Sequence, residues 1–133
     1  MRIVLVGATG AVGTEVRKIL EQRGHTDHDI VAVASPRSAG RKLDFADRTI
    51  EVQALATDVF HDGDLAIFDV PDEVSLEWAP IASDRGAVVV DKSAAWRMHD
   101  QVPLVVPEVN PEAVSDRPLG IIASPNCTTL AMV

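Results

Sequence analysis

The sequence has only one cysteine and is poor in basic residues. Its 133 residues include 12 Lys or Arg against 20 Asp or Glu, which gives a net charge of −8. Because nucleic acids and anionic membranes attract clustered Lys and Arg, this charge balance argues against both partners. The single cysteine has no intramolecular disulfide partner, which favours a reducing, cytoplasmic location.

Long hydrophobic runs are also lacking. The N-terminal residues 1–6 are apolar only briefly before Gly7, so they predict neither a signal peptide nor a membrane span. Internal repeats, low-complexity tracts and interdomain linkers are absent as well. With 47% hydrophobic residues, the chain is long enough for one domain with a real core. We therefore expect a single domain over residues 1–133.

Short apolar runs alternate with segments of helical period. Runs of strand length occupy residues 2–6, 29–34, 50–55, 65–68, 87–90, 104–106 and 119–123. A first helix is expected from the spacing of Val12, Val16, Ile19 and Leu20, with Gly24 as its C-terminal cap. A second is expected over residues 72–85, ending at Gly86 and kinked or shortened by Pro80.

This alternation predicts an α/β fold, a Rossmann-like doubly wound and mostly parallel sheet with helices on both faces. In such folds, ligands bind at the carboxyl ends of the strands. The expected loops are residues 35–48, 61–64 and 92–103, and each follows or adjoins an expected strand.

The turn after the first strand is rich in glycine, with the sequence Gly7-Ala-Thr-Gly-Ala-Val-Gly13. Glycines between a strand and a helix let the backbone turn tightly and approach a pyrophosphate, which the helix N–H groups bind. The spacing is Gly-x-x-Gly-x-x-Gly rather than the commoner Gly-x-Gly-x-x-Gly, but the strand before it and the helix after it supply the required context. We expect a dinucleotide site here.

The end of the second strand bears on the choice of cofactor. NAD-binding units usually place Asp or Glu there for the ribose 2′-hydroxyl, yet residues 33–40 contain no acid. They contain Arg37 and Ser38 instead. A guanidinium and a hydroxyl suit a 2′-phosphate, so the sequence favours NADP.

Cys127 lies in Ser124-Pro-Asn-Cys-Thr-Thr129, between an apolar run and an expected helix start. Backbone N–H groups and the positive end of a helix dipole favour a thiolate at such a position, as a nucleophile requires. A lone free cysteine is also commonly a buried packing residue. Its own segment leaves both interpretations open.

Arg97 follows the expected strand at residues 87–90. We expect it at the same sheet edge as Cys127, where an arginine can hold a phosphate or a carboxylate through two parallel hydrogen bonds. By spacing alone, a surface salt bridge is the more common interpretation.

Together these segments resemble the aspartate-semialdehyde dehydrogenase family over almost the whole chain. The resemblance rests on the glycine turn and on Ser35-Pro-Arg-Ser-Ala-Gly40, Asp91-Lys-Ser-Ala-Ala-Trp-Arg-Met98, Val102-Pro-Leu-Val-Val-Pro-Glu-Val-Asn110 and Pro125-Asn-Cys-Thr-Thr129. It implies NADP-dependent reductive dephosphorylation of 4-aspartyl phosphate to aspartate semialdehyde, on the route to lysine, methionine and threonine.

The resemblance also implies roles for individual residues. Cys127 would be the acyl-enzyme nucleophile, Arg97 would hold the substrate phosphate and Asn126 would help to shape that site. The nucleotide would be bound by the residues of the glycine turn and of the loop after the second strand, namely Gly7, Thr9, Gly10, Ala11, Val12, Gly13, Arg37 and Ser38. No metal ion is expected.

Family members are more than twice as long as this chain and are expected to form homodimers or homotetramers. Their acid/base histidine belongs to a second domain, and none of His25, His28, His61 and His99 matches its motif. We therefore expect residues 1–133 to be the N-terminal nucleotide-binding part of a larger two-domain enzyme, truncated and inactive alone.

Two positions depart from the family pattern. Asp69-Val-Pro-Asp72 stands where a Ser-Ala-Gly-Gly turn is common, and Lys92 stands where asparagine is common.

Two other functions remain open. One is an enzyme like N-acetyl-glutamyl-phosphate reductase, which residues 102–110 and Asn126-Cys127-Thr128 disfavour. The other is a non-catalytic nucleotide-binding module.

Overall fold

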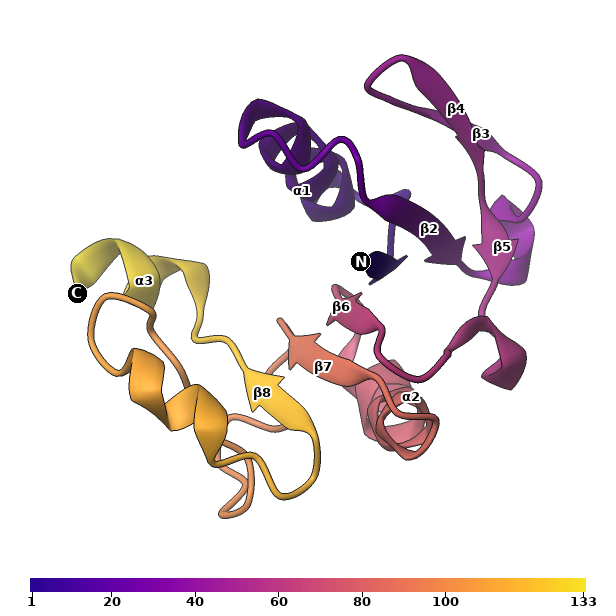
Figure 1. The fold of residues 1–133 in the computed structure, drawn as a ribbon. Coiled ribbons are helices and arrows are strands. Elements are labelled where there is room, and N and C mark those ends of the chain that lie inside the picture. Colours follow the sequence, from indigo (N-terminus) through magenta and orange to yellow (C-terminus); the bar gives the residue numbers. More distant parts are fainter.

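The computed structural model describes all 133 residues. Its centre is a six-stranded sheet in the order β5-β2-β1-β6-β7-β8 (Figure 1). Every neighbouring pair in this sheet is parallel. The strands are β1 (Arg2–Val6), β2 (Asp29–Ala34), β5 (Gln53–Ala54), β6 (Leu65–Phe68), β7 (Val88–Asp91) and β8 (Ile121–Ala123).

The helices are α1 (Ala11–Gln22), α2 (Asp72–Asp84) and α3 (Cys127–Met132), and the 3-10 turns are η1 (Pro36–Ser38), η2 (Thr57–Val59) and η3 (Pro111–Ser115). The first two helices lie on opposite faces of the sheet (Figure 1), so the expected doubly wound architecture is confirmed. No helix is both long and apolar enough to cross a membrane.

Alternation along β1 builds two hydrophobic cores. Ile3 and Leu5 face the core on the α1 side, whereas Val4 and Val6 face the core on the α2 side. All four are buried because a parallel strand in the middle of a doubly wound sheet is covered on both faces. This explains why the sequence of β1 is a continuous apolar run.

The expected apolar stripe of α1 is only partly correct. Val16 and Leu20 pack against the core, but Val12 and Ile19 are 43% and 46% exposed. The helix ends as expected at Gly24, whose φ of 78° only glycine adopts readily. His25 N donates to Leu20 O at 2.8 Å, and this bond satisfies a carbonyl at the helix end.

The region between β2 and β6 differs from the prediction. The expected loop at residues 35–48 contains η1 and a strand, β3 (Lys42–Phe45), which pairs antiparallel with β4 (Arg48–Glu51). The expected single strand at residues 50–55 is therefore wrong, because its first part joins this hairpin and its last part, β5, pairs with β2. Val52, buried between the two strands, donates its N–H to Arg41 O instead of to the parallel sheet.

Three further expectations are corrected. Residues 104–106 form a single bridge from Leu104 to Ala123 rather than a strand, because the Asn110 side chain accepts from Val106 N and donates to Leu104 O. Pro80 lies inside α2 without ending it, and the helix runs unbroken to Asp84. The last strand also starts later than expected, at Ile121, after a turn in which Gly120 N donates to Arg117 O.

Candidate functional site

A cavity of about 590 Å³ opens at the carboxyl edge of the sheet, between the ends of β1 and β6. The strand order reverses at this point, with β2 on one side of β1 and β6 on the other, and doubly wound folds bind ligands at such a reversal. The loops after β1, β2 and β6 and the start of α2 form its walls. Its lining residues are Val6, Gly7, Thr9, Gly10, Ala34, Ser35, Pro36, Leu55, Asp69, Val70, Pro71, Val74 and Trp78.

The three glycines of the first turn have different structural roles. Gly7 has a φ of 93°, and a Cβ there would lie 2.0 Å from Asp69 O. A Cβ on Gly13 would lie 2.4 Å from Gly7 O, so this glycine lets α1 pack onto the turn. At Gly10 the nearest atom to a Cβ would be 3.5 Å away. Its open backbone leaves room for a ligand at the start of α1, as a bound pyrophosphate requires.

The residues predicted from this turn lie partly inside and partly outside the cavity lining. Thr9 lines the cavity together with Gly7 and Gly10. Ala11 and Val12 form the exposed first turn of α1, outside the cavity lining. Of the six residues predicted from the turn, three therefore meet in the cavity, and the buried Gly13 supports them from behind.

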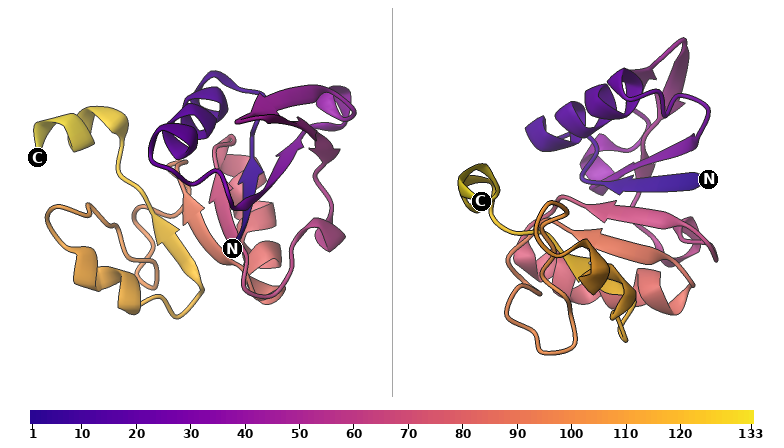
Figure 2. Two further views of the ribbon diagram at one scale, coloured as in Figure 1. Left: turned by 45° about the horizontal axis from the view of Figure 1, so that its top comes forward. Right: turned by 60° about the vertical axis from the view of Figure 1, so that its left-hand side comes forward.

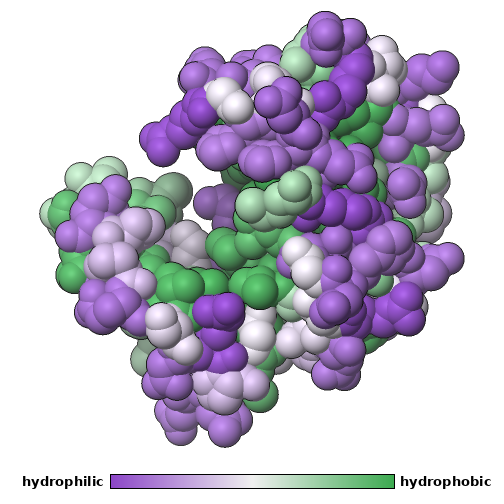
Figure 3. Space-filling view, in the orientation of Figure 1, coloured by the Kyte–Doolittle hydropathy of each residue, from purple (hydrophilic) through white to green (hydrophobic).

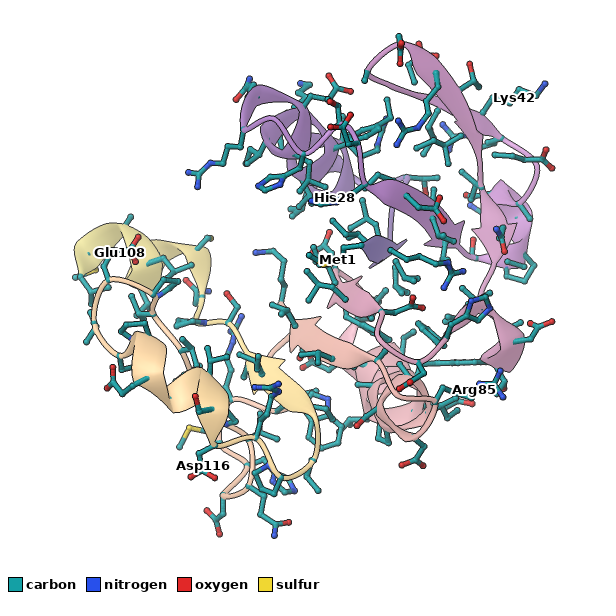
Figure 4. All side chains as sticks on the ribbon, in the orientation of Figure 1. Met1, His28, Lys42, Arg85, Glu108 and Asp116 are labelled. Carbon is teal, nitrogen blue, oxygen red and sulfur yellow. The ribbon has the colours of Figure 1, made fainter.

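Arg37 and Ser38 lie in η1, immediately after the cavity residues Ser35 and Pro36. The Arg37 side chain is exposed and makes no hydrogen bond within the protein. It stands at the rim of the cavity rather than in its wall. Lys42, on the neighbouring hairpin, points outward from the molecule (Figure 4).

Asp69 is a cavity residue that the sequence analysis noted only as a departure. Its N–H donates to Val6 O at 2.9 Å, which fixes the turn after β6 against β1. Burial raises the pKa of its carboxyl above the usual value, and the positive charge of Lys92 offsets part of that rise. An acid after a buried strand was the available signal, but its place beside Gly7 depends on the pairing of β1 with β6.

The raised pKa of Asp69 gives a prediction about stability. A group with a raised pKa in the folded protein favours folding below its unfolded pKa, and this contribution is lost as the pH rises through the folded pKa. We expect Asp69→Asn to raise the urea midpoint slightly near neutral pH, with the gain vanishing in acid where both states are protonated. Asp47→Asn, at an exposed hairpin position, is the control. An equal gain at every pH would contradict the assignment.

Cys127 is the first residue of α3 and is exposed. The Asn126 side chain caps this helix by accepting from Thr128 N at 2.8 Å. Figure 2 shows α3 projecting away from the sheet, and Figure 3 shows apolar surface in the hollow beside this C-terminal segment. Cys127 is therefore not buried within this chain, and its expected setting between a strand and a helix start is confirmed.

Arg97 reaches the segment that carries Cys127. Its Nε donates to Ser124 O at 2.9 Å, and its Nη2 donates to Lys92 O at 3.0 Å. The guanidinium thereby ties the loop after β7 to the loop after β8, and Nη1 makes no hydrogen bond within the chain. Arg97 forms no salt bridge, so the surface ion pair favoured by spacing alone is wrong.

Comparison with known proteins places these features in one family. Residues 2–117 match the family model described as semialdehyde dehydrogenase, NAD binding domain. An aspartate-semialdehyde dehydrogenase of Aquifex aeolicus is 48% identical over 134 residues, which cover 99% of this chain and 39% of that protein. A relative from Bacillus subtilis with the same name is 43% identical and is covered to 38%. The chain thus spans about two fifths of the length of the curated relatives it matches.

Solved structures agree with the sequence comparison. The crystal structure of aspartate semialdehyde dehydrogenase II from Vibrio cholerae, complexed with ASA, superposes with a TM-score of 0.90 at 39% identity, over 98% of this chain and 43% of that chain. The enzyme from Candida albicans, solved with NADP, gives a TM-score of 0.73 at 28% identity, with 97% and 43% covered. The chain belongs to the semialdehyde dehydrogenase family and matches the NAD-binding domain of that family.

Proposed function

We propose that residues 1–133 form the NADP-binding domain of an aspartate-semialdehyde dehydrogenase and contribute its nucleophile, Cys127. The main observation behind the proposal is that two features lie at the same edge of the sheet. The nucleotide cavity between β1 and β6 and the segment joining Arg97 to Cys127 both lie at the carboxyl ends of parallel strands. The names of the relatives support the substrate, aspartyl phosphate or aspartate semialdehyde.

The residues of the cavity fit a dinucleotide. Gly10 leaves space at the start of α1, where free N–H groups bind a pyrophosphate. The apolar residues Leu55, Val74 and Trp78 offer flat and aliphatic surface to a base. Arg37 and Ser38 lie just beyond the wall, with no acid among residues 33–40, so the proposal favours NADP over NAD.

The chemistry of the site follows from its side chains. The Cys127 thiolate attacks the acyl carbon of the aspartyl phosphate, and the bond to phosphate breaks to leave a thioester. The departing phosphate takes the electron pair, and we assign its binding to Arg97, whose Nη1 makes no hydrogen bond within the chain. When bound, NADPH supplies the hydride that converts the thioester to the aldehyde. The exposed position of Cys127 leaves the thiol open to substrate.

Nucleotide titration of the purified 133-residue chain tests the proposal. We expect NADP⁺ to bind more tightly than NAD⁺ by calorimetry and to change the fluorescence of Trp78, which lines the cavity. Trp96 is buried outside that lining, so Trp78→Phe should remove most of the change while NADP⁺ still binds. Absence of binding by either nucleotide would contradict the proposal, and equal affinities would contradict the preference for NADP.

A further inference from the structure

Asp91 is a buried acid without a cationic partner. It is the last residue of β7 and is 0% exposed. The salt bridges of the chain involve only Arg2 and Lys18 with other acids. Both carboxyl oxygens accept from hydroxyls instead, Oδ1 from Ser75 Oγ at 2.7 Å and Oδ2 from Ser93 Oγ at 2.6 Å. Burying a carboxyl group costs free energy unless its hydrogen bonds are satisfied. A functional role would account for an acid at this buried position.

Each of the two hydroxyls also accepts a hydrogen bond from the loop after β7. Ser75 Oγ accepts from Trp96 Nε1 at 3.1 Å, and Ser93 Oγ accepts from Ala95 N at 3.2 Å. Each hydroxyl has one proton to donate, and each donates it to Asp91. The carboxyl group is therefore the final acceptor of two chains of hydrogen bonds that both start in residues 95–96.

Arg97 is the next residue of the same loop. The start of this loop is held by Asp72, whose Oδ1 accepts from Ala94 N at 2.9 Å. The two chains from Asp91 hold residues 95–96, and the backbone leads directly to the guanidinium that binds Ser124 O. No other side chain of β7 has this connection to the Cys127 segment.

We propose that Asp91 is a positioning residue, which through Ser75, Ser93 and Trp96 fixes the guanidinium of Arg97 against the segment that leads to Cys127. The inference rests on the proposed function of Arg97 as the phosphate-binding residue. It assigns a role to a buried hydrogen-bond network whose members, Asp91, Ser75, Ser93 and Trp96, are not themselves lining residues of the cavity.

Alkylation of Cys127 provides the test, with inorganic phosphate as the probe. Cys127 is the only thiol in the chain, so the rate of its reaction with iodoacetamide is read without interference. Phosphate held by Arg97 near the sulfur is expected to slow the reaction in wild type. In Ser75→Ala and in Ser93→Ala, half-protection should require about tenfold more phosphate, the order expected when support for a charged hydrogen bond is lost.

Ser83→Ala is the matched control. Ser83 is another hydroxyl on α2, and it donates to Leu119 O at 2.6 Å outside the Asp91 network. We expect it to match wild type in phosphate protection even if it lowers the urea midpoint as much as Ser75→Ala does. The far-ultraviolet circular dichroism spectrum should match wild type in all three serine variants, which shows that the domain remains folded.

Arg97→Ala distinguishes a failure of the positioning role of Asp91 from a failure of the phosphate-binding role of Arg97. Loss of protection in Arg97→Ala with normal protection in both Ser75→Ala and Ser93→Ala would overturn the positioning role of Asp91 and leave Arg97 as the phosphate residue. Equal protection in wild type and Arg97→Ala, or no protection in wild type, would overturn the phosphate role of Arg97 and the inference that rests on it.

Discussion

Replacing Gly13 by alanine is expected to destabilise the domain by about 3 kcal/mol or more, the range of severe core clashes. The direction is unusual, because Gly→Ala inside a helix ordinarily stabilises it by up to about 1 kcal/mol. Here the added Cβ would lie 2.4 Å from Gly7 O and 2.9 Å from backbone atoms of Ala8. These are backbone atoms, so α1 must move off the sheet to relieve the contact. Urea denaturation followed by circular dichroism measures the loss.

Gly10→Ala is the natural comparison, because the two glycines lie three residues apart in the same turn. Its Cβ would meet nothing closer than 3.5 Å, so we expect a change of no more than about 1 kcal/mol, as for other substitutions at a helix N-cap. Its methyl group would intrude on the cavity and weaken nucleotide binding. Similar stabilities for the two variants would show that α1 does not rest on the glycine turn as described.

Arg37→Ala is expected to weaken NADP⁺ binding by roughly 10- to 100-fold while leaving NAD⁺ binding nearly unchanged. A charge-assisted hydrogen bond contributes about 1.5–3 kcal/mol, and only the 2′-phosphate of NADP⁺ would receive it. Because the Arg37 side chain is exposed, its removal should leave the urea midpoint unaltered. Calorimetric titration with both nucleotides gives the ratio of affinities.

Arg41→Ala serves as the matched variant for this experiment. Arg41 is also basic and exposed, and it lies four residues away in the same connection between β2 and β3. Arg41→Ala should weaken the binding of both nucleotides slightly and equally, because it removes only a positive charge. If Arg37→Ala behaved in the same way, the 2′-phosphate would have to be recognised elsewhere and the preference for NADP would lose its basis.

The parts of the fold that were predictable are those in which local pattern and final environment agree. Residues 3–6 and 30–34 are apolar throughout because both faces of β1 and β2 are covered, and the structure places these strands at the predicted residues. The β3–β4 hairpin was missed because Leu43 and Phe45 alternate with exposed Lys42 and Asp44. Such alternation indicates a half-buried strand, but here it lasts only four residues, the shortest length at which the pattern is informative.

The candidate site also contains parts that could be predicted from the sequence and parts that could not. The glycine turn and the segment around Cys127 are each one continuous stretch of sequence, so their positions between a strand and a helix could be predicted without the fold. Asp69 faces Gly7 only because β6 pairs with β1 across some 60 residues of chain. The contact of Asp91 with Ser75 likewise depends on how α2 packs onto β7, and no local pattern specifies that packing.

The bond from Arg97 to Ser124 O has a mechanical consequence. It joins the loop after β7 to the loop that leads to Cys127, so the guanidinium and the residue that follows β8 are held to each other. In any longer protein built on this domain, hinge motion of further residues would change how the thiol is covered and which groups approach it. The contact between Arg97 and Ser124 lies within this domain, so such motion would change access to the guanidinium without removing the backbone carbonyl that holds it.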